Sequence, residues 1–137
     1  MDKKQHSFIF ESEGLDMSII NQKTILPLLI GEALKRGAIE AKSVSVRSIV
    51  TAPWVRLKCT YGCDLFGTSP CCPPKTPTPK EMQEILDCYT SALLLHFDGR
   101  TTPANVIADL ERSAFLAGYY KAFGLGAGPC RLCTTCR

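Results

Sequence analysis

Seven of the eight cysteines in this 137-residue chain fall into two clusters. The clusters read Cys59-x3-Cys63-x7-Cys71-Cys72, inside the segment KCTYGCDLFGTSPCCPP, and Cys130-x2-Cys133-x2-Cys136, close to the last residue. Thiolates are soft, charged ligands, and several of them stay together only when a cation neutralises them. Glycine and proline flank both clusters, and these residues form tight turns that leave backbone N–H groups available to sulfur. The two clusters therefore predict a metal site.

The second cluster matches the first three positions of the bacterial ferredoxin run C-x2-C-x2-C-x3-C-P. A complete run would also need a remote cysteine, so the end at Arg137 either truncates a longer protein or requires that ligands come from elsewhere. The same thiols would equally suit tetrahedral zinc. The spacing favours an iron–sulfur cluster of the 4Fe-4S type, with zinc as the alternative.

The first cluster has a less familiar spacing. Its opening C-x3-C is similar to a radical-SAM loop, but that loop needs a further cysteine at position 66, where Phe66 stands. Cys71 and Cys72 are adjacent and point in different directions, so we choose Cys72 as the ligand and leave Cys71 open between ligand and structural thiol. The candidate metal ligands of the two clusters are Cys59, Cys63, Cys72, Cys130, Cys133 and Cys136.

Composition places these thiols in a soluble protein of one domain. Hydrophobic residues make up 45% and charged residues 21% of the chain, and the net charge of +3 is dispersed, which predicts no nucleic-acid partner. The N-terminus does not read as a secretory signal, and Ile25 to Ile30 is far shorter than the roughly 20 apolar residues of a membrane span. We expect a cytoplasmic protein without membrane contact, where clustered cysteines bind metal more often than they form disulfides. A disulfide framework is the alternative.

The elements before the first cluster are a helix and two strands. Residues 1–22 are weakly patterned, although Ser7 to Glu11 fits a short edge strand. Apolar residues at helical spacing predict an amphipathic helix from Thr24, ended by Gly37. Alternating residues predict a strand over 43–50, with a bulge, and a second over 54–58 that delivers the chain to Cys59.

Two helices and a strand separate the clusters. Thr78-Pro79-Lys80-Glu81 reads as a capping box and predicts a helix that ends near Thr90. The apolar run over 92–97 predicts a strand covered on both sides, with a buried helix segment as the alternative. A last helix is expected from Thr102 to about Phe123, and the glycines over 124–128 end it. The order of elements predicts an α/β fold, or an α+β one, in a single domain over 1–137.

Other residues that could do chemistry have a structural interpretation. The glycines of GLGAGP follow a helix rather than a strand, so they do not form a nucleotide loop. His6 and His96 are expected to be structural, and Cys88, late in a helix, is expected to be a core thiol. No Ser-His-Asp set is present, and we predict no catalytic residue.

Three stretches of the chain together resemble a known family. VRLKCTYGCDLFG…CCPP, TPTPKEM and FLAGYYKAFGLGAGPCRLCTTC are similar to the predicted metal-binding proteins of domain of unknown function family 2284, from about Thr24 onward. The resemblance implies a cysteine-rich iron–sulfur protein whose motif cysteines match the six candidates above, and it implies no established reaction. The family continues with further cysteines that are absent here, so the chain is expected to be C-terminally shortened. Cys71 falls where another residue is usual.

These observations leave three functions open. The first is an iron–sulfur protein that transfers electrons, or assists a redox partner protein. The second is a zinc-stabilised binding or regulatory module. The third, a thiol–disulfide oxidoreductase using Cys130 and Cys133, ranks last because its motif should open a helix after a strand. For a shared site, Cys59, Cys63 and Cys72 should converge with the Cys130 loop near them, and a homo-oligomer could complete the ligand set.

Overall fold

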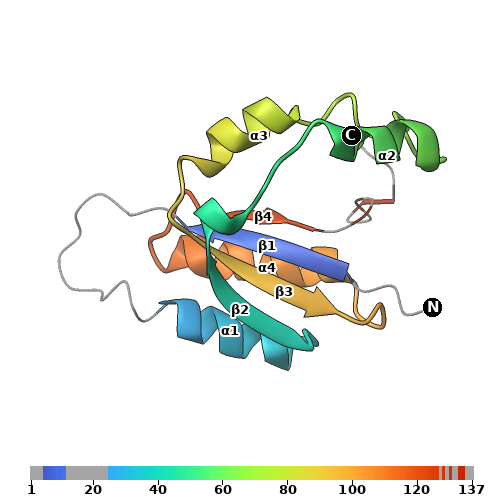
Figure 1. The fold of residues 1–137 in the computed structure, drawn as a ribbon. Helices are drawn as coiled ribbons and strands as arrows, with labels where there is room; N and C mark the ends of the chain where they lie inside the picture. Colours follow the sequence, from blue (N-terminus) through green and yellow to red (C-terminus); the bar gives the residue numbers. More distant parts are fainter. Residues whose placement is uncertain (1–4, 12–24, 127, 129, 131–132, 135–137) are drawn as a thin grey trace.

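The computed structural model describes residues 5–11, 25–126, 128, 130 and 133–134 (Figure 1). Its helices are α1 (Ile25–Lys35), α2 (Trp54–Gly62), α3 (Pro79–Leu86) and α4 (Pro103–Leu116), with a 3-10 turn over Val46–Ser48. Its strands are β1 (Gln5–Glu11), β2 (Glu40–Ser45), β3 (Ser91–Phe97) and β4 (Phe123–Leu125). Helices and a four-stranded antiparallel sheet make an α/β fold, as the sequence predicts.

The sheet is built around β3. The strand order is β2-β3-β1-β4, so β3 pairs with both β1 and β2. The continuous apolar run of β3 suits this position, because both faces of an interior strand are covered. Leu93, Leu95 and Phe97 are fully buried on one face and Ala92 on the other.

Two cores lie on opposite faces of this sheet. The larger core joins Leu93, Leu95 and Phe97 to Leu29 and Ala33 of α1 and to the buried side of α4, which is formed by Val106, Ile107, Leu110 and Ala114. The smaller core joins Phe10 and Ala92 to Val46 and to Leu86 of α3. Figure 1 shows α1 and α4 on one side of the sheet, and α2 and α3 on the other.

Helix α3 begins as its sequence predicts. The Thr78 hydroxyl accepts the backbone N–H of Glu81 at 3.2 Å, and the Glu81 carboxylate accepts the backbone N–H of Thr78 at 2.6 Å. The backbone hydrogen bond from Thr78, followed by the hydroxyl contact, holds the pKa of Glu81 below its ordinary value. The capping box fixes the start of α3 relative to the proline-rich segment before it.

The segment after α3 is tied to the segment between α4 and β4. The Tyr89 hydroxyl donates a hydrogen bond to the backbone carbonyl of Lys121 at 2.9 Å. Burial raises the pKa of Tyr89, so the phenol remains the protonated donor that this contact needs. The contact brings the segment that leads into β4 close to the smaller core, against which Tyr89 packs.

The N-terminal half departs from the sequence prediction in three places. The strand predicted over 7–11 is present, but it is interior, because β4 pairs with its outer side. The strand predicted over 43–50 ends at Ser45 and continues as the 3-10 turn. The strand predicted over 54–58 is wrong, since these residues begin α2. Cys59 therefore lies within a helix and not at the end of a strand anchored in the core.

Two further differences concern where helices end. Helix α3 ends at Leu86 rather than near Thr90, and α4 ends at Leu116 rather than near Phe123. Gly118 has a φ of 97° and allows the chain to turn back after α4. Phe123, expected to finish that helix, begins β4 instead, and Gly124, expected to end the helix, lies within this strand, so the segment leading to Cys130 begins at the edge of the sheet.

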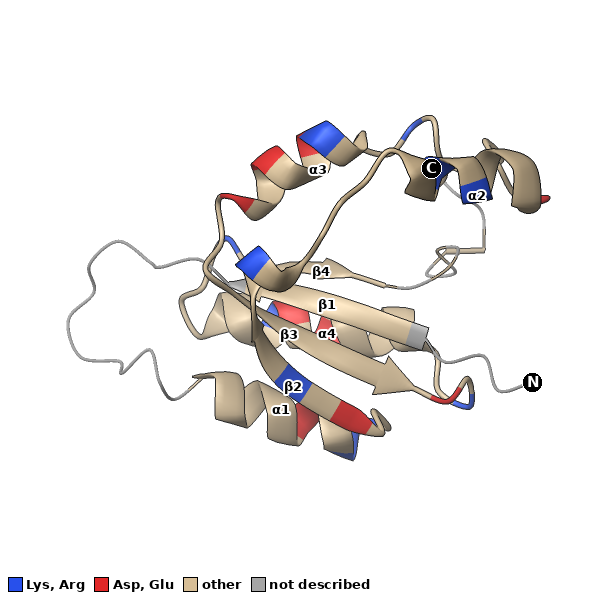
Figure 2. Cartoon of the chain, viewed as in Figure 1, with Lys and Arg blue, Asp and Glu red and all other residues tan. Residues whose placement is uncertain are grey.

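Charged residues of both signs are spread over the described helices and strands (Figure 2). Figure 2 shows basic and acidic residues interspersed on α3 and β2, with lysine or arginine also on α2 and after β3. None of the helices in the described segments is long and apolar enough to cross a membrane.

Candidate metal centre

Helix α2 carries Cys59 and ends beside Cys63. Pro53 precedes its first residue and Cys63 is its C-cap, so the two thiol-bearing residues are about one helical turn apart. No residue of α2 is buried. The helix is instead held by Arg56, whose guanidinium donates to the backbone carbonyls of Thr76 and Pro77, each at 2.6 Å.

The loop after α2 is a series of tight turns. Backbone N–H groups of Phe66, Thr68, Cys72 and Lys75 each donate to the carbonyl three residues earlier. Gly67 has a φ of 72° and supplies the left-handed residue that such turns need. The Ser69 hydroxyl donates to the Cys72 sulfur at 3.4 Å, a contact of the kind that supports ligating thiolates.

The C-terminal segment is positioned by α4. The backbone N–H of Gly124 in β4 donates to the Glu111 carboxylate at 2.7 Å. A Cβ atom at position 124 would lie 2.3 Å from Cγ2 of Ile107, so only glycine allows β4 to approach α4 this closely.

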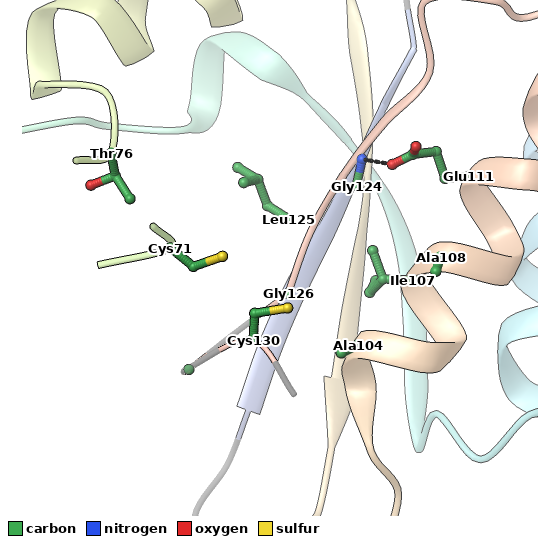
Figure 3. A pocket seen from close by; sticks show the side chains of 11 residues that line it. Cys71, Thr76, Ala104, Ile107, Ala108, Glu111, Gly124, Leu125, Gly126 and Cys130 are labelled. Carbon is green, nitrogen blue, oxygen red and sulfur yellow. Dashed lines mark hydrogen bonds between the residues drawn. The ribbon is translucent and has the colours of Figure 1, made fainter. Parts of the chain in front are cut away.

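The two cysteine segments meet at a cavity of about 450 Å³, within the range of roughly 300–1,000 Å³ typical of ligand pockets. One wall is the α4 face that includes Ala104, Ile107 and Glu111, and another is the backbone of β4 and the glycines after it. Cys71 and Thr76 border it from the segment between α2 and α3, and Cys130 from the C-terminal segment (Figure 3). Two segments far apart in the sequence thus present thiols to one space.

The predicted ligands are distributed over both segments. Cys59 and Cys72 are half-buried, and Cys63, Cys130 and Cys133 are exposed. Cys136 lies outside the described residues. Within the part of the chain that the structure describes, no three Cys, His, Asp or Glu side chains are close enough together to hold a metal ion. The expected convergence of Cys59, Cys63 and Cys72 is therefore not seen there, and the six ligands remain a prediction.

The chemistry of the donors nevertheless fits a thiolate-bound metal. The described cysteines of the two clusters lie on loops, at a helix end and on an exposed helix, and none of them belongs to either core. Soft sulfur donors match iron–sulfur clusters and zinc better than they match magnesium or calcium. One described cysteine of each cluster, Cys71 and Cys130, borders the cavity.

Sequence reasoning missed two polar residues at this cavity, Glu111 and Thr76. Glu111 follows Ile107 by four residues, so the two side chains lie on the same side of α4. A carboxylate beside an otherwise apolar stripe is the signal that could have identified it. Thr76 carries no such signal, because its place depends on the path of the proline-rich connector.

The structure also places Cys88, expected to be a core thiol, and His6 and His96, expected to be structural. Cys88 is exposed, and its thiol donates to the Glu84 carbonyl at 3.5 Å, so the prediction of a core thiol is wrong. The rings of His6 and His96 stack across the β1–β3 pair, with centroids 5.1 Å apart. Nε2 of His96 is buried and has no hydrogen-bond partner among the described residues.

Large apolar side chains surround the first cysteine cluster. Trp54, Leu57 and Tyr61 on α2 are 58%, 55% and 84% exposed, and Leu65 and Phe66 in the next loop are also exposed. A surface helix usually buries one apolar face. Helix α2 buries none, so the packing of this chain alone gives it little stability.

Comparison with known proteins gives one result. No curated protein and no solved structure matches the chain significantly. A family model described as "Predicted metal-binding protein (DUF2284)" matches residues 42–137, which include both cysteine clusters and exclude β1 and α1. This match covers well over half of the chain and agrees with the resemblance carried by its cysteine motifs. The chain belongs to the DUF2284 family of predicted metal-binding proteins.

Proposed function

We propose that this metal-binding protein holds an iron–sulfur cluster and serves in electron transfer, or as an accessory to a redox partner protein. The observation that carries the proposal is that the two cysteine-bearing segments, far apart in the sequence, border one cavity. The ferredoxin-like spacing from Cys130 to Cys136 favours iron–sulfur over other thiolate-bound metals. A reducing compartment such as the cytoplasm would keep these thiols available to metal.

The exposed position of the cysteine segments supports a redox role. Cys63, Cys130 and Cys133 are exposed and α2 has no buried residue, so a cluster held there would lie near the surface. When bound, such a cluster supplies reversible one-electron chemistry, with a potential set by its exposure and by hydrogen bonds to its sulfurs. The Ser69 hydroxyl, 3.4 Å from the Cys72 sulfur, is one such donor.

A zinc-stabilised binding or regulatory module is the second candidate. It is favoured by the lack of buried residues in α2, because structural zinc often replaces the core that a small segment cannot build. In this alternative the metal would fix α2 and the loop after it, and the exposed apolar residues of α2 would contact a partner.

Anaerobic purification, followed by absorption spectroscopy and analysis for iron, zinc and acid-labile sulfide, separates the two candidates. We expect a brown protein with iron and sulfide in comparable amounts, and a paramagnetic signal on one-electron reduction or oxidation. A variant with Cys130 and Cys133 both replaced by alanine should lose the part of this colour that comes from the C-terminal cysteine run, whereas Cys88→Ala should keep all of it. A colourless protein with stoichiometric zinc that cannot be reconstituted with iron would contradict the proposal.

A further inference from the structure

The neighbouring cysteines Cys71 and Cys72 have different surroundings. Cys72 is half-buried and accepts the hydrogen bond from Ser69 within its own turn. Cys71 is exposed and lines the cavity between the loop and α4. Consecutive side chains of an irregular loop cannot easily bind one metal, so the two thiols are placed to serve different sites.

The C-terminal run contains three cysteines and needs a fourth donor. A 4Fe-4S cluster or a tetrahedral zinc ion takes four protein ligands, and in ferredoxin-like runs one of them comes from a remote position. Cys130, the first member of the run, lines the same cavity as Cys71. Figure 3 shows both thiols at this cavity, carried by different segments.

The rest of the cavity wall offers few competing ligands. The α4 side is largely alanine and isoleucine, and the β4 side contributes glycine backbone and Leu125. Oε2 of Glu111 already accepts the Gly124 N–H at 2.7 Å. Thr76 carries a neutral hydroxyl, which is a poor ligand for a soft metal site. Cys71 is thus the best-suited donor facing Cys130.

We propose that Cys71 is the remote fourth ligand of the metal held by Cys130, Cys133 and Cys136. The inference rests on the proposed metal-binding function and adds the residue that completes the C-terminal set. Cys72 is assigned to the other set, with Cys59 and Cys63. The peptide bond between Cys71 and Cys72 would then connect the two sets of metal ligands.

Double variants test this assignment. Cys71→Ala and Cys130→Ala should each remove the same spectroscopic species from the anaerobically reconstituted protein, and combining them should remove nothing more, since they act on one site. Cys72→Ala is the matched control one residue away. Combined with Cys130→Ala, it should remove more iron, sulfide and paramagnetic signal than either change alone, because the two residues belong to different sites. Iron, sulfide and the paramagnetic spectrum are measured for each variant, and Cys88→Ala should match the wild type.

Cobalt titration gives a readout that does not depend on cluster assembly. Co²⁺ bound to thiolates has a charge-transfer band whose intensity follows the number of sulfur ligands. At the C-terminal site, Cys71→Ala should lower this band by about a quarter, one ligand of four. It should also weaken Co²⁺ binding at least about tenfold, the smallest loss usual even for outer-shell changes.

Alkylation of the unmutated holoprotein avoids any effect of substitution on folding. With metal bound, Cys71 and Cys130 should resist iodoacetamide while Cys88 reacts, and chelation should expose both. Rapid labelling of Cys71 in the metal-loaded protein, or an unchanged cobalt band in Cys71→Ala, would overturn the assignment and leave the proposed function standing. A wild-type chain that binds neither iron nor cobalt would overturn both.

Discussion

Gly124 is the residue on which the approach of β4 to α4 depends most directly. The nearest atom to a Cβ at this position is Cγ2 of Ile107, whose β-branched side chain is 4% exposed and has little freedom to move. The backbone N–H of the same glycine is held by Glu111. One residue thus aligns the segment that leads to Cys130.

Gly124→Ala should lower the free energy of unfolding by about 1–3 kcal/mol, the usual cost of overpacking a close contact. The matched control is Gly31→Ala in α1, where a Cβ would meet nothing within 4 Å. That change should stabilise the protein by about 0.5–1 kcal/mol, because alanine favours the helix interior. Denaturant titration of both variants measures the difference. If Gly124→Ala were as stable as the wild type, β4 would not pack on α4 as described.

Single residues were predictable from the sequence where local chemistry decides their role. The Thr78 and Glu81 pair is an example, since a capping box depends on residues three apart. Cys71 was left open between ligand and structural thiol, because its surroundings depend on how the loop folds against β4. Cys88 was misplaced because α3 ends before it, which leaves its side chain exposed.

At the scale of elements, α2 differs from the other helices because no residue of it is buried. The cation–π contact of Lys58 with Trp54, at 5.2 Å, lies within the helix. Arg56 links α2 to a distant part of the chain, since its guanidinium donates to the carbonyls of Thr76 and Pro77. The same connector leads into α3 and borders the cavity through Thr76.

Arg56→Ala should loosen α2 from this connector. Hydrogen bonds from a charged donor contribute enough free energy to the closed state of α2 that their loss should make amide exchange in this helix about tenfold faster. Exchange in β3 and α4 should be unchanged. Hydrogen exchange followed by mass spectrometry measures this, and Arg112→Ala on the exposed side of α4 is the control. Equal protection of α2 in both variants would mean that Arg56 does not hold the helix.

The sequence predicted the type of an element correctly where one face of it is buried, because apolar residues then recur at the spacing of a helix or a strand. The apolar faces of α1 and α4 and the apolar run of β3 predict the right types, because these residues form the larger core. The alternating residues over Trp54 to Lys58 predicted a strand. No residue of this segment is buried in a core, so its apolar residues are not constrained to helical spacing even though it forms a helix. The helix forms there without the signal that usually reveals it.

At the scale of the whole molecule, the stable part and the candidate metal centre are separate. The sheet, α1 and α4 surround the larger core, whereas α2 and the loops of the first cysteine cluster contribute no residue to either core. Local opening of a segment with few buried contacts need not unfold the remainder. The sequence predicted the α/β class, but not the strand order, because no local pattern specifies that β1 pairs with both β3 and β4.

Removal of metal should therefore affect one part of the molecule. We expect a chelator to raise amide exchange over 54–77 while β3 and α4 keep their protection, with little change in the far-ultraviolet circular dichroism. Metal-loaded protein taken through the same steps without chelator is the control. Loss of protection in β3 on chelation would show instead that the metal stabilises the core itself.

The hydrogen bond from Gly124 to Glu111 also bears on self-association. Strand β4 is an edge of the sheet, and an edge with unpaired N–H groups is a template on which another chain can add a strand and start aggregation. Glu111 occupies the N–H at the centre of this three-residue strand, so a second molecule finds no donor there. The carboxylate that aligns the cysteine segment thereby also occupies a backbone donor that another strand would need in order to pair with this edge.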